Sequence, residues 1–110
     1  MMMQAEAVKL FLEGRKVYAF EPVARKVFAI VDYGLDGRCA VLFSTGKTDT
    51  GVYGFTGNAY WTRYEAFRSG ESNAFHLKSL GPGIAQAYFT NGVKAFVQSH
   101  SADLAGILEA

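Results

Sequence analysis

The chain contains 110 residues, which suffice for one compact domain spanning residues 1–110 and are too few for two domains of ordinary size. Half of the residues are apolar and 15% are aromatic, a composition that excludes disordered and fibrous proteins. Eleven Lys and Arg oppose ten Asp and Glu, which leaves a net charge of +1. Because nucleic-acid binding draws on a strongly basic surface, this balance argues against nucleic acid as a partner.

Cysteine and histidine are too sparse to indicate a metal site or an internal disulfide. The chain has the single Cys39 and two separated histidines, His76 and His100, so no zinc-ligand spacing is present. We expect no metal and no cofactor. The first residues lack the basic and apolar regions of a secretory signal, and no run approaches the length of a membrane span. These features predict a soluble cytoplasmic protein with no membrane partner.

The first half of the chain is expected to form one helix followed by antiparallel strands. Residues 4–13 place their apolar side chains on one side, which indicates a helix. Residues 16–21 are rich in strand-forming types and are followed by a proline. Residues 26–33 and 38–44 are two further strands, and the glycines and aspartate of residues 34–37 favour a tight turn between them. We therefore predict a hairpin here.

The middle of the chain combines glycines with aromatic residues. Four glycines between residues 46 and 57 indicate a mobile loop that leads into a short strand at residues 52–56. A helix is predicted at residues 58–69, because Tyr60 and Tyr64 recur at a helical spacing on one face.

The last part of the chain offers one strand and two helices. Residues 75–80 alternate in a way that suits a half-exposed strand. Residues 83–99 segregate polar from apolar positions over four helical turns, which favours a helix. The alternative is a hairpin, because Asn91-Gly92 is a strong turn signal. Residues 102–110 are predicted to form a short terminal helix.

Together these elements predict the α+β class: a small antiparallel sheet of four or five strands with helices packed on one face. The expected order is α-β-β-β-β-α-β-α-α. Consecutive strands joined by short links imply antiparallel pairing, and no linker is long enough to divide the chain.

No motif identifies a catalytic residue. Residues 46–48 read Gly-Lys-Thr, but a phosphate-binding loop needs a glycine where this chain has Val41. Cys39 lies within a predicted strand, where a small core residue is the simpler interpretation than a nucleophile. His76 and His100 have no carboxylate pattern beside them that indicates acid or base chemistry. These observations favour a protein that binds over one that catalyses.

The most distinctive segment carries six aromatic residues between residues 53 and 67. Such rings beside glycines can line a pocket for a planar or cationic ligand, can anchor a protein interface, or can simply fill the core. The candidate ligand- or partner-binding residues are Tyr53, Phe55, Tyr60, Trp61, Arg63 and Tyr64.

These residues leave two functions open. The first is a small soluble non-catalytic binding domain that acts through protein–protein interaction or self-association, because so many rings are hard to bury in one small globule. A homodimer face would then come from residues 83–99 and 102–108. The alternative is a small-molecule-binding protein or small enzyme with an aromatic-lined pocket around residues 53–67. That alternative predicts a cavity of a few hundred cubic ångströms with an inward His, Asp or Glu, and a solid interior would exclude it.

Overall fold

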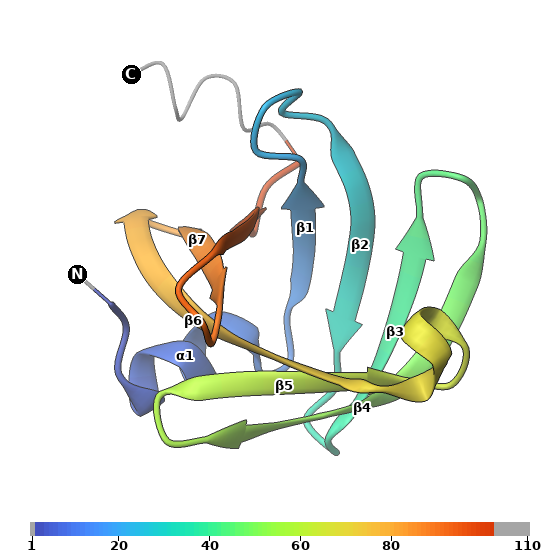
Figure 1. Ribbon diagram of the computed structural model, residues 1–110, viewed down its shortest axis with the longest axis horizontal. Helices are drawn as coiled ribbons and strands as arrows, with labels where there is room; N and C mark the ends of the chain where they lie inside the picture. The colour runs from blue at the N-terminus through green and yellow to red at the C-terminus, as the bar shows by residue number, and fades with distance from the viewer. Residues whose placement is uncertain (1, 103–110) are drawn as a thin grey trace.

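The computed structural model describes residues 2–102 and shows a closed barrel (Figure 1). Within these residues eight antiparallel strands follow one another around the barrel in sequence order, and β1 pairs with β8 to close it. A helix precedes the strands, and a short helical turn separates β5 from β6. The elements are α1 (Ala5–Leu12), β1 (Lys16–Phe20), β2 (Val27–Tyr33), β3 (Arg38–Phe43), β4 (Thr48–Thr56), β5 (Ala59–Tyr64), η1 (Phe67–Gly70), β6 (Ser72–Gly81), β7 (Ile84–Phe89) and β8 (Lys94–Ser99).

The first elements confirm the sequence prediction. The chain forms α1, then β1, then the hairpin of β2 and β3, in which Val31 pairs with Val41. The turn of this hairpin uses its aspartate as expected, because Asp36 Oδ1 accepts a hydrogen bond of 3.1 Å from the Arg38 backbone N–H. The strand predicted at residues 75–80 lies within the longer β6.

The predicted α+β class is wrong, since the described residues form an eight-stranded antiparallel barrel with one short α-helix. Strands replace the helices predicted at residues 58–69 and 83–99. A closed barrel gives every strand an inward and an outward face, so that side chains alternate between the interior and the exterior. Residues 83–99, which the α+β prediction placed in a helix on one face of the sheet, are themselves part of the barrel wall.

The strand predicted at residues 52–56 lies within the longer β4, which also takes up part of the predicted loop before it. Strand β5 and the turn η1 replace the helix predicted at residues 58–69. Tyr60, Thr62 and Tyr64 point into the barrel, and each is at most 7% exposed. Tyr60 and Tyr64 share one face of a strand as well as one face of a helix, because a spacing of four residues fits both periods. The intervening Thr62 belongs to the same inner face, which only the strand explains.

The hairpin of β7 and β8 replaces the helix predicted at residues 83–99, and the alternative based on Asn91-Gly92 is the structure observed. Gly92 adopts a φ of 88°, which glycine reaches without steric cost. Gln86 misled the prediction, because it is buried on a strand although it is polar. Its side-chain amide donates to two backbone carbonyls, each 3.0 Å away, at an irregularity between the two strands.

Helix α1 closes one end of the barrel, at the lower left of Figure 1. Its side chains Val8, Phe11 and Leu12 are buried in the same core as the inward residues of the strands. His100 secures the helix from the end of β8: its Nε2 lies 2.8 Å from the carbonyl oxygen of Phe11, and the two rings lie 4.4 Å apart. The interior is therefore sealed at this end.

The terminal helix predicted at residues 102–110 falls outside the described residues, apart from its first position. The helix predicted at residues 83–99, which was to form most of the dimer face, is replaced by strands β7 and β8 of the barrel. Self-association itself stays a prediction. Among residues 2–102, no helix is both long and apolar enough to cross a membrane.

Candidate functional site

The interior of the barrel contains a cavity of about 260 Å³. This volume equals about nine water molecules at liquid density, whereas close-packed protein interiors rarely keep voids larger than a single water. Small residues on neighbouring strands leave the space open, among them Ala19, Ala29, Val31 and Val41. No Asp, Glu, Lys, Arg or His lines the cavity within the described part of the chain. It is the candidate ligand site.

The polar side chains of the cavity wall are uncharged. Tyr33, Tyr60, Tyr64, Thr62 and Asn73 line it together with Gln98, which is only 2% exposed. The Gln98 side-chain nitrogen donates a hydrogen bond to the Tyr60 hydroxyl oxygen. The other end of this amide, Gln98 Oε1, is buried and lacks a hydrogen-bond partner among the described residues. The site thus combines apolar walls with one unsatisfied polar atom.

Burial keeps the phenols of this wall neutral. Loss of water raises the pKa of Tyr33 well above its ordinary value of 10.0, and it also raises the pKa of Tyr60 and Tyr64. Neighbouring phenols add to the shift at Tyr33 and Tyr64, because two close negative charges would repel. All three side chains therefore remain hydrogen-bond donors through the physiological pH range.

These shifts predict how the protein responds to alkali. A folded pKa above the unfolded one leaves stability unchanged below the unfolded value of about 10, and stability falls as the pH rises beyond it. We expect Tyr33, Tyr60 and Tyr64 to ionise together with unfolding, observed as phenolate absorbance that rises in step with the loss of circular dichroism. The variant Tyr60→Phe should remove part of that late absorbance. Ionisation of these phenols near pH 10 in a protein that stays folded would contradict the assignment.

A rim of phenylalanines surrounds the end of the cavity opposite α1. Phe28 and Phe96 pack edge to face with ring centroids 5.8 Å apart, and Phe43 lies 5.1 Å from Phe67 of η1. Phe89 at the end of β7 also lines the cavity. Phe67 is 40% exposed, so the cavity reaches the surface beside η1. This phenylalanine rim gives the site an apolar entrance, and Figure 1 shows η1 at the opposite side of the barrel from α1.

Asp49 holds η1 over this entrance. Its Oδ2 accepts hydrogen bonds from the backbone N–H groups of Phe67 at 2.8 Å and of Ala66 at 3.1 Å, and its Oδ1 accepts one from Thr50 at 2.8 Å. The Phe67 bond, supported by the other two, lowers the pKa of the Asp49 carboxyl below its ordinary 3.8. The Asp49 carboxylate is therefore ionised and accepts these hydrogen bonds at neutral pH. The stabilisation that they provide is lost as the pH falls through the lowered pKa of Asp49.

We expect Asp49→Ala to release η1 and to speed the exit of a bound ligand several-fold, with little change in the melting temperature. A stopped-flow measurement of the dissociation rate of a fluorescent ligand checks this. The matched control is Asp36→Ala, because Asp36 also accepts a turn N–H but lies beside Leu35, which contacts Gly14 just after α1. Equal dissociation rates for Asp49→Ala and the native protein would show that η1 does not control the entrance.

The structure brings only part of the predicted site together. Tyr60 and Tyr64 line the cavity as the pocket hypothesis expected, whereas Tyr53 and Phe55 do not. Tyr53 is buried, and its hydroxyl donates to the backbone carbonyl of Gly34. Phe55 packs near α1, where the Lys9 ammonium lies 5.6 Å from its ring centroid. These two rings support the closed end of the barrel instead of the cavity.

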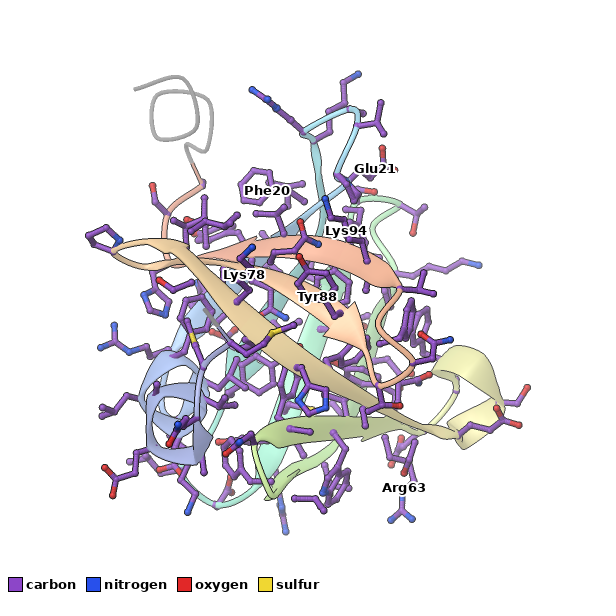
Figure 2. All side chains as sticks on the ribbon, turned by 60° about the vertical axis from the view of Figure 1, so that its left-hand side comes forward. Phe20, Glu21, Arg63, Lys78, Tyr88 and Lys94 are labelled. Carbon is purple, nitrogen blue, oxygen red and sulfur yellow. The ribbon has the colours of Figure 1, made fainter. Side chains whose placement is uncertain are left out.

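Trp61 and Arg63 lie on the outside of β5. Both alternate with the inward tyrosines, and Figure 2 shows Arg63 extending away from the barrel. The Trp61 ring covers Gly54 of β4, since a side chain at Gly54 would come within 2.7 Å of that ring. The proposed anchoring role of these two residues in a protein interface stays a prediction, and they take no part in the cavity.

Sequence reasoning missed the cavity residues on the other strands. Gln98, Phe89 and Phe96 were assigned to a helix, and Phe28 was treated only as part of a hydrophobic strand. The available signal was the turn at Asn91-Gly92, which places Gln98 and Phe96 on one strand face two residues apart. The expected inward His, Asp or Glu is not among the lining residues in the described part of the chain.

The described lining residues of the cavity include three tyrosines and no Asp, Glu, Lys, Arg or His. Cys39 is not one of these lining residues, and burial raises the pKa of its thiol, which disfavours the thiolate. Comparison with protein-family models, with curated proteins and with solved structures finds no match for this chain.

Proposed function

We propose that this protein binds a small, neutral and mainly apolar molecule inside the barrel. The observation that carries the proposal is the 260 Å³ cavity, lined by rings and aliphatic side chains and containing the unpartnered Gln98 Oε1. An eight-stranded barrel is wide enough either to be filled by its own side chains or to hold one small ligand. Here small residues at Ala19 and Ala29 leave the space unfilled.

The lining favours a neutral ligand over a charged one. A buried ion is strongly destabilised unless an opposite charge or several hydrogen bonds compensate for lost hydration. The described lining residues include no carboxylate for a cation and no basic group for an anion. Trp61, one of the six rings that favoured a planar or cationic ligand on the sequence, lies outside the cavity, and so does Arg63. The volume and the opening beside Phe67 suit a molecule of up to three rings or a short aliphatic chain.

The proposal can be tested with N-phenylnaphthylamine, a neutral dye whose fluorescence rises in apolar surroundings. We expect a saturable increase in its emission with a shift to shorter wavelength and one site per chain. Binding should weaken little with added salt, because no ion pair contributes. Absence of saturable binding up to the solubility limit of the dye would contradict the proposal. Trp61 fluorescence is a poor reporter here, because that ring lies on the outer face.

A further inference from the structure

The Gln98 side chain is the most informative group in the cavity. It lies on β8 between Ala19 of β1 and Ala85 of β7, which pair with it in the sheet. Both neighbours are small, so neither can cover the amide. Gln98 is only 2% exposed, and its side-chain nitrogen donates a hydrogen bond to the Tyr60 hydroxyl oxygen.

The oxygen of this amide is an exception to the usual rule for buried groups. Nearly all buried polar atoms in folded proteins have a hydrogen-bond partner, because an unpaired one loses water without replacement. Gln98 Oε1 is the buried side-chain atom that lacks such a partner within residues 2–102. By contrast, Gln86 is also buried, and its amide nitrogen reaches two carbonyls outside the cavity. The missing partner of Gln98 is thus a property of the cavity.

We infer that the ligand carries a hydroxyl group on its apolar body and that this hydroxyl donates a hydrogen bond to Gln98 Oε1. The inference rests on the proposed function and specifies its ligand: an aliphatic alcohol or a phenol. A ketone, ester or ether has no hydrogen to donate. A carboxylate has none either and would bring an unpaired charge, and an ammonium would enter without a carboxylate partner in the lining.

A hydroxyl also suits the other groups around Gln98. The Gln98 nitrogen already donates to the Tyr60 hydroxyl oxygen, which leaves Oε1 as the end of the amide that needs a donor. Tyr60 keeps its proton at neutral pH, as its burial requires, so its hydroxyl can donate to the ligand oxygen. One hydroxyl can therefore act as donor and acceptor in the same polar corner, as an acceptor-only group cannot.

The test compares naphthol, naphthalene and naphthoate as competitors of bound N-phenylnaphthylamine. Hydrophobic burial alone ranks naphthalene first, because it has no polar group to dehydrate. The inference predicts the opposite order: naphthol should bind about tenfold more tightly than naphthalene or better. Naphthoate should bind most weakly of the three.

Two variants assign the preference to Gln98. Gln98→Met has a similar length without an amide, and Gln98→Leu is a second replacement should the first fail to fold. In either variant, the affinity of naphthol relative to naphthalene should fall to about one or below, whatever the change in affinity for the dye. The matched control is Gln86→Met, which removes a buried glutamine outside the cavity. It should keep the preference for naphthol whatever its effect on the melting temperature.

The outcomes separate the inference from the proposed function. If the dye binds but naphthol and naphthalene compete equally, or if Gln98→Met keeps the preference, the hydroxyl assignment is overturned and the binding function stands. If neither the dye nor any competitor binds the folded native protein, the proposed function fails and the inference fails with it.

Discussion

Replacing Ala29 with phenylalanine should lower the affinity for N-phenylnaphthylamine by roughly a hundredfold or more, because the new ring and the dye compete for one volume. Ala29 is 4% exposed, lines the cavity, and pairs with Phe43 of β3 and Ala19 of β1. The added ring enters an existing void instead of a packed core. The free energy of unfolding should therefore stay unchanged or rise.

The matched control for this experiment is Ala40→Phe. Ala40 lies on β3 opposite Asp32 and is exposed on the outer face of the barrel. The same added volume there should leave dye affinity unchanged. Fluorescence titration of both variants, with melting temperatures to verify folding, makes the comparison. Normal dye binding by a folded Ala29→Phe would place the dye outside the barrel and would remove the proposed function.

The sequence predicts elements best where local signals agree. The hairpin of β2 and β3 combines continuous strand-forming residues with a glycine- and aspartate-containing turn, so propensity and turn chemistry point to one structure. The segment of β7 and β8 lacks that agreement. Ile84 and Val97 are buried in a second apolar cluster on the outer face, so both faces of this hairpin are apolar in part. The alternation of polar and apolar residues that marks a strand is therefore unclear in this segment, and the sequence favours a helix instead.

The binding site is harder to predict than the elements, because it depends on the closure of the barrel. Tyr60 and Gln98 are 38 positions apart in sequence, and their contact exists only because β8 returns to close the ring of strands. No local pattern reports such a contact. The concentration of rings between residues 53 and 67 did identify two cavity residues, Tyr60 and Tyr64, since aromatic side chains fill barrel interiors and line pockets alike.

Two glycines of β4 show how a loop signal can have a packing cause. A Cβ atom at Gly51 would lie 2.2 Å from the Arg63 carbonyl oxygen and 2.8 Å from the Tyr64 Cα, both of which are backbone atoms of β5. A Cβ atom at Gly54 would instead meet the ring of Trp61, a side chain. Glycine in a strand often marks such a close approach, so these positions belong to the sheet although they resemble loop residues.

Gly51→Ala should therefore be severely destabilising, by about 3 kcal/mol or more, because the adjoining strand cannot move away without breaking the β4–β5 pairing. Gly54→Ala is the matched control. It should cost no more than about 1 kcal/mol, because the half-buried Trp61 ring can turn aside and alanine suits a strand better than glycine does. Urea unfolding of both variants measures the difference. Equal stabilities would show that β4 and β5 are not held as closely at Gly51 as the barrel requires, and that the cavity wall formed by Tyr64 can shift.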